Sequence, residues 1–329
     1  MKLDENALLW ACMQLSPEHV PAGLVSKAAV DSGSRCGLRC PFCATGNGSL
    51  ALGKEMMSKG RFADILARLP RLKLMTLHQW GEPLLNADIY EMIEAASRRG
   101  VEVIVSTSLS IPSFDANAAR RLISSGLSRL IVSCDGASRR TYEQYRVGGD
   151  FDLVMRNLRT LLAAKRGLKS AGPRIDWRFL VHRGNQHEIW AAARRARALG
   201  TGFVVEKLGI PREDSPRWAP DPAVLQRVPL NQRRSPRRVW RNKPDKWTGI
   251  CLQAWSMPVV RADGTVLPCC VVSDSRYALG NILREPFEKI WNKPLIVAMR
   301  RYLKAGTKSD MKLPCHGCPH DPNAPDRGQ

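Results

Sequence analysis

The sequence lacks any hydrophobic run of the roughly 18 residues that a membrane-spanning helix needs. It also lacks an export signal, because its first residues, M-K-L-D-E-N-A-L-L-W-A-C-M, carry acids where a signal peptide has cations. These two absences exclude a membrane-spanning protein and predict a cytoplasmic location. No internal repeat is present beyond an alternation of strand-like and helix-like segments.

Acidic residues are scarce relative to basic ones, since 30 Asp and Glu against 51 Lys and Arg give a formal net charge of +21. Such a charge predicts an anionic partner, which could be a phosphorylated or carboxylated small molecule, a nucleotide conjugate or nucleic acid. The ten cysteines of a chain without an export signal would meet a reducing cytosol. We therefore expect their clusters to bind a metal or an iron–sulfur centre and not to form disulfides.

Residues 27–210 are predicted to form the main domain. Short β-rich runs alternate there with amphipathic helical stretches, which is the pattern of βα units around a parallel sheet. The six predicted strands cover residues 28–34, 72–78, 101–107, 128–133, 174–181 and 202–206. The predicted fold class is therefore α/β, a partial (β/α)6 TIM-like barrel whose chemistry lies in the loops at the C-terminal ends of its strands.

The other segments flank this barrel. Residues 1–26 form an N-terminal extension, and residues 211–248 form a basic linker, rich in Pro and Arg, that breaks the βα pattern. Residues 249–320 are predicted to form a small cysteine-rich module, in which Asp263-Gly264 between alternating β-formers is typical of a hairpin turn. Residues 321–329 are predicted to be a disordered tail.

Three cysteines follow the first predicted strand in the run C-G-L-R-C-P-F-C. Cys36, Cys40 and Cys43 lie on one loop, so their thiolates can converge on one metal centre. A structural zinc takes four ligands and a 4Fe-4S cluster usually has four cysteines, so three cysteines leave one iron open to bind a reactant. The alternative is a zinc knuckle completed by a distant His or Cys.

The C-x-x-x-C-x-x-C spacing, with the aromatic Phe42 before the last cysteine, resembles the signature of the radical S-adenosylmethionine (SAM) superfamily. Residues 77–85, L-H-Q-W-G-E-P-L-L, are similar to its second-strand G-G-E-P motif, with Trp80 in place of the first glycine. The fourth strand ends in the family's S-x-D-G pattern at residues 133–136, followed by a Y-x-x-x-R segment at residues 142–146. The third strand departs from the family by ending S-T-S-L-S, where many relatives have T-N-G.

This resemblance implies that Cys36, Cys40 and Cys43 hold a 4Fe-4S cluster, to which SAM binds through its methionine amine and carboxylate. It also implies that backbone carbonyls near Gly81 and Glu82 contact the SAM amino group. The residues that it assigns to SAM binding are Phe42, Gly81, Glu82, Pro83, Ser133 and Asp135.

Four further cysteines lie in the C-terminal module, two of them in the pair C-H-G-C and two flanking the predicted hairpin: Cys251, Cys269, Cys315 and Cys318. Four thiolates can close around one centre, and their order and surrounding sequence resemble twitch, the shortened form of the SPASM extension of radical SAM enzymes. The resemblance implies one auxiliary 4Fe-4S cluster, and zinc is the alternative. Cys270 could replace Cys269 as a ligand, but adjacent strand residues point to opposite faces, so only one should reach the centre.

Three residues are candidates for a direct part in the reaction. Cys134 or Cys270 would be a hydrogen-atom donor, as in radical epimerases, whereas the alternative for Cys134, and for Cys12, is a plain buried thiol. Arg178, on the fifth predicted strand, would hold a substrate hydroxyl, carboxylate or phosphate if it faces the barrel interior. The alternative for Arg178 is a strand-end side chain that meets solvent.

The resemblance predicts a radical SAM oxidoreductase or epimerase, which cleaves SAM reductively to a 5′-deoxyadenosyl radical with an electron from flavodoxin or ferredoxin. Only 35 residues precede Cys36, too few for the peptide-recognition domain of peptide-modifying relatives. This favours a small substrate, and the net charge favours an anionic one. The similarity to twitch enzymes that act on sugars and aminocyclitols implies a sugar, aminocyclitol or nucleotide-linked sugar, and its dehydrogenation or epimerisation. The alternatives are a peptide maturase, an RNA-modifying enzyme and, from another class, a zinc-dependent nucleic-acid-binding protein.

Overall fold

The computed structural model describes residues 17–50, 55–210, 214–228, 251, 253–305, 309–316, 318 and 321. They divide into two compact units. The core unit comprises the described residues within 31–59 and 76–228, and the auxiliary unit those within 17–30, 60–75 and 251–321. Among these residues, no helix is both long enough and apolar enough to cross a membrane.

The core unit contains four parallel strands in the order β6-β5-β4-β3. The register pairs Thr107 with Val132 and Ser133 with Arg178, so the C-terminal ends of these strands lie along one edge of the sheet. The strands span Glu102–Thr107 (β3), Arg129–Ser133 (β4), Arg174–Val181 (β5) and Gly202–Lys207 (β6).

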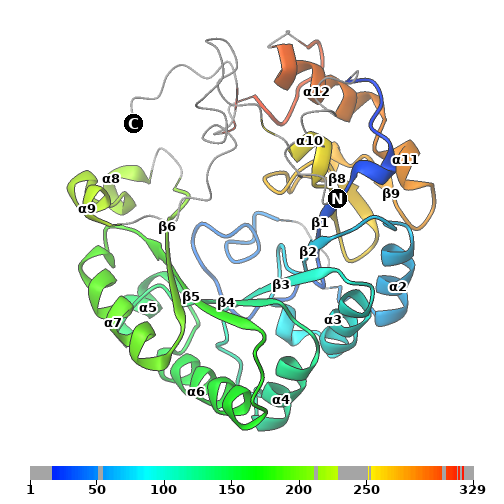
Figure 1. Cartoon of the computed structure of the whole chain (residues 1–329). Helices are drawn as coiled ribbons and strands as arrows, with labels where there is room; N and C mark the ends of the chain where they lie inside the picture. Colours follow the sequence, from blue (N-terminus) through cyan, green and yellow to red (C-terminus); the bar gives the residue numbers. More distant parts are fainter. Residues whose placement is uncertain are drawn as a thin grey trace. The chain divides into compact units, whose positions relative to one another are not determined.

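Helices of the core unit alternate with these strands, and α3, α4, α6 and α7 lie on the outer side of the sheet in Figure 1. Aspartates fix two helix starts, since Asp115 accepts a hydrogen bond from the Ala118 amide and Asp150 one from the Leu153 amide. The helices are η2 (Pro83–Leu85), α3 (Ile89–Arg98), α4 (Ala116–Ser124), α5 (Arg139–Tyr145), α6 (Phe151–Gly167), η3 (Gln186–Glu188), α7 (Ile189–Leu199), α8 (Ser215–Trp218) and α9 (Pro222–Arg227).

The auxiliary unit has its own strands, in the order β2-β1-β7-β8-β9. β7 and β8 are antiparallel around Asp263-Gly264, where Gly264 has a φ of 86° and the Thr265 amide donates to Asp263 Oδ1 at 2.9 Å. The predicted hairpin is thus confirmed. The elements are η1 (Ala22–Leu24), β1 (Lys27–Val30), α2 (Lys59–Ala67), β2 (Leu74–Thr76), α10 (Gln253–Ser256), β7 (Val259–Val260), β8 (Thr265–Leu267), η5 (Ser275–Tyr277), β9 (Gly280–Asn281), α11 (Phe287–Ile290) and α12 (Pro294–Ala305).

The predicted α/β class with a mainly parallel sheet is confirmed, and each predicted strand corresponds to one of β1 to β6. The first strand ends at Val30 and not at residue 34. The reason is that the backbone after it pairs with residues 55–57 instead: the Met57 amide donates to Ser32 O at 3.0 Å and the Ser34 amide to Glu55 O at 3.0 Å.

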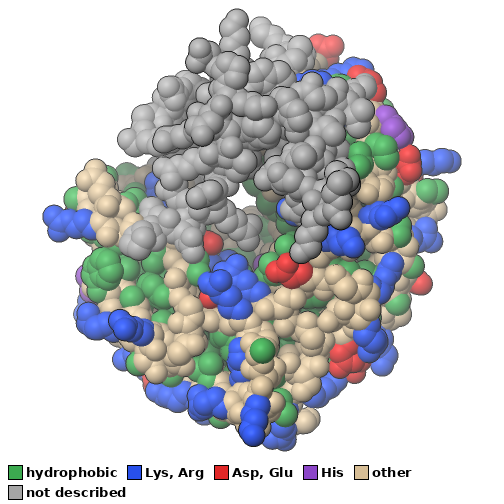
Figure 2. Space-filling model, in the orientation of Figure 1, with side chains coloured by type: hydrophobic (Ala, Val, Ile, Leu, Met, Phe, Trp, Pro, Cys, Tyr) green, Lys and Arg blue, Asp and Glu red, His purple; other side chains and the backbone are tan. Residues whose placement is uncertain are grey.

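Some predictions fall on parts of the chain that are not described. Cys12, residues 211–213 and 229–248 of the predicted linker, and residues 322–329 of the predicted tail lie outside the described residues. The predicted domain boundaries at residues 26, 210 and 248 stay predictions. On the face that Figure 2 shows, Lys and Arg side chains are dispersed over the described surface with Asp and Glu among them.

Candidate active site

Three cysteines of the core unit share one compact loop. The Cys43 amide donates to Cys40 O at 3.1 Å, and the Leu38 amide lies 3.5 Å from the Cys36 sulfur. Cys40 is buried, and Cys36 and Cys43 are half-buried. The pKa of Cys36 is raised to about 11, mainly by burial and partly by the nearby charges of Glu82, Cys40 and Cys43, while the hydrogen bond from the Leu38 amide lowers it. Clustered, buried thiols of this kind fit the binding of a positively charged metal centre, which stabilises their thiolate forms.

Aromatic side chains cover this loop within the core unit. The ring of Phe42 packs edge-on against Trp218 at a centroid distance of 5.3 Å and lies 6.3 Å from the ring of Tyr145. Beside Phe42 is a cavity of about 880 Å³, within the size range of ligand sites. Its lining includes Pro41, Phe42, Asn47, Gln144, Ile210 and Trp218. The structure thus places the predicted SAM-binding Phe42 at a pocket next to the cysteines.

The Gly-Glu-Pro loop lies directly against the cysteine loop. A Cβ at Gly81 would collide with the backbone oxygen of Gly33, so only glycine fits this approach. The Glu82 amide donates to Arg35 O at 2.7 Å, one residue before the first cysteine. Pro83 is buried and begins η2. The backbones of the two motif loops are therefore in direct contact.

The carboxylate of Glu82 is almost completely buried and accepts hydrogen bonds from several groups. Thr107 Oγ1, the Ser108 amide and Ser108 Oγ each donate to it at 2.7 Å, and the Leu84 amide donates at 3.2 Å. Thr107 and Ser108 belong to the S-T-S-L-S segment that departs from the family pattern. This segment therefore holds the Glu82 side chain, which fits the expectation that the loop contacts SAM through its backbone.

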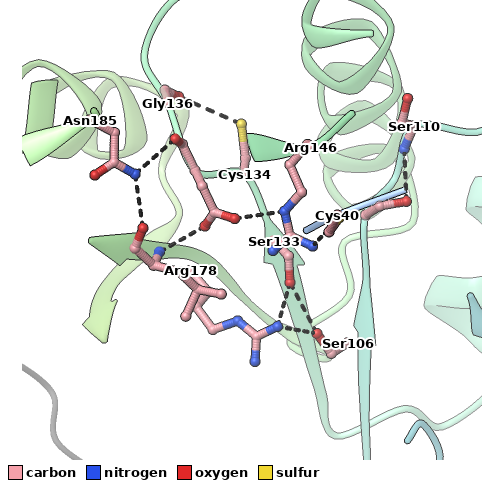
Figure 3. Close-up of polar contacts among 12 residues, drawn as sticks. Cys40, Ser106, Ser110, Ser133, Cys134, Gly136, Arg146, Arg178 and Asn185 are labelled. Carbon is pink, nitrogen blue, oxygen red and sulfur yellow. Dashed lines mark hydrogen bonds and ion pairs between the residues drawn. The ribbon is translucent and has the colours of Figure 1, made fainter. Parts of the chain in front are cut away.

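Arg178 faces the same side of the sheet as two serines on neighbouring strands, as Figure 3 shows. Its Nη2 donates to Ser133 Oγ at 2.6 Å and to Ser106 Oγ at 3.1 Å, and the two hydroxyls lie 3.2 Å apart. The Ser106 amide donates to His78 Nδ1 at 3.1 Å. The structure thus brings the predicted residues Ser133 and Arg178 together at the C-terminal ends of β4 and β5.

Asp135 reaches the cysteine loop through Arg146. Asp135 is fully buried, and its Oδ2 accepts from Arg146 Nε at 2.6 Å while its Oδ1 accepts from the Leu180 amide at 2.7 Å. Arg146 Nη1 lies 3.9 Å from the Cys40 sulfur, within hydrogen-bonding distance of a sulfur acceptor. Sequence reasoning gave Arg146 no role of its own, although the Y-x-x-x-R segment was the available signal.

The structure does not bring Cys134 to these residues. It is fully buried, its thiol donates to Gly136 O at 3.7 Å, and its backbone oxygen accepts from Trp177 Nε1 at 2.6 Å. In Figure 3 its sulfur points away from Arg178 and Ser133, as expected for neighbours on a strand.

The auxiliary unit gathers cysteines around a second, smaller cavity of about 70 Å³. Five cysteines line it: Cys251, Cys269, Cys270, Cys315 and Cys318. Burial raises the pKa of Cys251 to about 11 and that of Cys269 to about 12. Such thiols fit a group that neutralises thiolates, and Cys270 lies among them and not in the core unit.

Across the described ranges, no group of three or more His, Cys, Asp or Glu side chains converges as the ligands of one metal ion do.

Two family profiles match the chain. The radical SAM superfamily profile matches residues 30–173, which include the cysteine loop, the Gly-Glu-Pro loop and the S-x-D-G segment. The profile of the SPASM iron–sulfur cluster-binding domain matches residues 251–319, which include all five cysteines of the second cavity.

Curated relatives are 22–27% identical to the chain over the aligned residues. Mycofactocin maturase MftC of Mycobacterium tuberculosis is 26% identical over 59% of this chain and 48% of its own length. PqqA peptide cyclase of Streptomyces rochei is 22% identical over 91% and 82%, and AdoMet-dependent heme synthase of Methanosarcina barkeri is 23% identical over 78% and 79%. The chain spans about half the length, or less, of the first curated relatives it matches.

Among solved structures, Streptococcus suis SuiB bound to S-adenosylmethionine superposes with a TM-score of 0.65 at 13% identity, over 84% of this chain and 68% of that one. This likeness shows the fold and confirms the TIM-like partial barrel. Together with both family matches, it shows that the chain belongs to the radical SAM superfamily and carries a C-terminal SPASM domain, with 4Fe-4S clusters and SAM as its cofactors.

Proposed function

We propose that this radical SAM enzyme modifies a peptide, and that the acidic character of that peptide matches the positive charge of the chain. The observation that carries the proposal is the similarity to PqqA peptide cyclase over 91% of this chain, through both domains. Two further PqqA peptide cyclases match over about half of the chain. These relatives support the peptide alternative better than the sugar or aminocyclitol expected from the sequence.

In this proposal Cys36, Cys40 and Cys43 hold the SAM-binding cluster, and four cysteines of the auxiliary cavity hold the second. When bound, the first cluster and SAM supply reductive cleavage of SAM and hydrogen-atom abstraction. The chain's share is to hold the reactants in place and keep water away. Phe42 and Trp218 shield the cysteine loop, and the anchored Glu82 fixes the loop beside it.

Arg178 is the residue that we assign to an anionic group of the reactants. Its guanidinium Nη2 donates to the hydroxyls of Ser106 and Ser133, which orient it at the C-terminal ends of the strands. A carboxylate placed beside it would gain charge-assisted hydrogen bonds from both the guanidinium and the hydroxyls. An Asp or Glu side chain of the peptide, or the SAM carboxylate, supplies such a group.

The test compares substrates by their effect on SAM cleavage. Anaerobically reconstituted enzyme is given dithionite, SAM and either short acidic peptides encoded beside its gene or nucleotide-linked sugars. We expect a peptide to raise 5′-deoxyadenosine formation above the rate without substrate and to change its own mass. Stimulation by a sugar, with no peptide active, would overturn the proposal.

Replacing Arg178 by Met separates its two assignments. Loss of a charge-assisted hydrogen bond costs about 1.5–3 kcal/mol, or roughly tenfold to a hundredfold. If the carboxylate belongs to the peptide, peptide turnover falls by that factor while substrate-independent SAM cleavage persists. If it belongs to SAM, both fall together. An unchanged KM for both reactants contradicts the assignment of Arg178.

A further inference from the structure

Arg146 joins a buried carboxylate to one of the three loop cysteines. Its side chain is 12% exposed and that of its partner Asp135 is 0% exposed. Nε donates to Asp135 Oδ2 at 2.6 Å, and Nη1 lies 3.9 Å from the Cys40 sulfur. Figure 3 shows the guanidinium of Arg146 beside Cys40. Its Nη2 is buried without a hydrogen-bond partner among the described residues, which leaves it able to serve a further acceptor.

The backbone around Arg146 fixes its position relative to the cysteine loop. Arg146 is the C-cap residue of α5, and its amide donates to Tyr142 O at 2.9 Å. The next residue, Val147, accepts from the amide of Arg39 at 2.7 Å, so the segments on either side of the Arg146–Cys40 contact are tied together. Gly148 follows with a φ of 84°, and a Cβ there would crowd Gly37 O at 3.3 Å.

Asp135 is held just as firmly at the other end. Its Oδ1 accepts from the Leu180 amide at 2.7 Å, and its backbone oxygen accepts from Asn185 Nδ2 at 3.0 Å. A buried carboxylate with these partners keeps the guanidinium in one orientation, because a buried charge without its counterion is strongly destabilising. The N–H groups on the far side of the guanidinium are thereby directed to the sulfur of Cys40.

A hydrogen bond to a cluster thiolate favours the reduced state of the cluster. Reduction adds a negative charge, and part of that charge resides on the sulfur ligands, where an N–H donor stabilises it. The guanidinium is an always-charged donor, so its effect on the sulfur exceeds that of a neutral amide. The sign is therefore fixed: the Arg146 contact makes the reduction potential less negative.

We propose that Arg146, oriented by Asp135, is the positioning residue that makes the SAM-binding cluster easier to reduce. This inference rests on the proposed ligation of that cluster by Cys40. The Y-x-x-x-R segment then has a function separate from substrate choice, since the contact involves the cluster ligand and not the reactants.

The test measures the reduction potential of the SAM-binding cluster in Arg146→Met, by a potentiometric titration followed by electron paramagnetic resonance. We expect the ratio of reduced to oxidised cluster at a fixed potential to fall about tenfold, which corresponds to about 59 mV for one electron. Arg146→Lys keeps the charge and should lie between Arg146→Met and the unaltered enzyme. The auxiliary cluster of the same sample serves as an internal standard and should not shift.

Arg129→Met is the matched control, because Arg129 also pairs with a buried aspartate of the core unit, Asp176, and contacts no cysteine. It should leave both potentials unchanged. An unchanged potential in Arg146→Met, with iron content retained, overturns the inference, as does an equal shift in Arg129→Met. Failure of Cys40 as a ligand would show differently, as iron content that Cys40→Ala does not lower.

Discussion

The two cysteine sites differ in how much of their surroundings is polar and in how many thiolates they contain. The loop in the core unit has three cysteines, and a cavity of about 880 Å³ adjoins its Phe42 and is lined by polar side chains such as Asn47 and Gln144. The auxiliary site places five cysteines around about 70 Å³, among residues such as Met299 and Leu303. The first arrangement leaves room for a reactant and the second does not. The site with only three cysteines is thus the one that has a large cavity nearby. A centre that binds a reactant needs both an open coordination position and such space, whereas a centre that only transfers electrons needs neither.

Removal of the three loop cysteines should have the largest effect on the difference between the two sites. In Cys36→Ala, Cys40→Ala and Cys43→Ala combined, we expect loss of about four of about eight irons per chain and no 5′-deoxyadenosine with dithionite. The auxiliary irons should remain, because their ligands are separate. Iron and sulfide analysis with product chromatography measures both. Equal iron loss from the two sites would show that they are not independent.

A second experiment asks which of Cys269 and Cys270 is a ligand of the auxiliary cluster. Burial and then the charges of Cys269, Cys251 and Cys318 raise the pKa of the Cys315 thiol. These four are the ligands predicted from the sequence, and we expect Cys269→Ser to lose the auxiliary cluster while Cys270→Ser keeps it. Iron content and electron paramagnetic resonance, measured in the background without the three loop cysteines, report this cluster alone. The opposite result would assign the ligand to Cys270.

The smallest expected effect tests how the open site holds SAM. Glu82→Gln places an amide among four donors that now share a carboxylate, and leaving one such group unsatisfied costs about 1–3 kcal/mol. We expect the KM for SAM to rise about tenfold with iron content unchanged. Glu94→Gln, on the exposed face of α3, is the control and should change nothing. A normal KM in Glu82→Gln would separate this carboxylate from the SAM site.

Local spacing carried most of what the sequence predicted. The positions of β1 to β6 follow from short apolar runs, and the cysteine triplet and the Asp263-Gly264 turn are readable because each depends on neighbours in the chain. The contacts of Glu82 with Ser108, and of Arg146 with Cys40, join residues 26 and 106 positions apart. Such pairs depend on how the strands are placed in the sheet, which no single segment encodes. The prediction for the first strand ran past Val30 for the same reason, because the backbone that follows it pairs with residues 55–57, which are distant in the sequence.

The close approach of Gly81 to Gly33 has a consequence for how the enzyme can vary and fail. Because no side chain fits between these two backbones, and the Glu82 amide bonds to Arg35 O, the two loops cannot slide past one another. We therefore expect an oxidant that distorts the cysteine loop also to displace the backbone of the Gly-Glu-Pro loop. Loss of activity and loss of SAM affinity should then follow the same time course, and rebuilding the cluster on the cysteine loop should restore both.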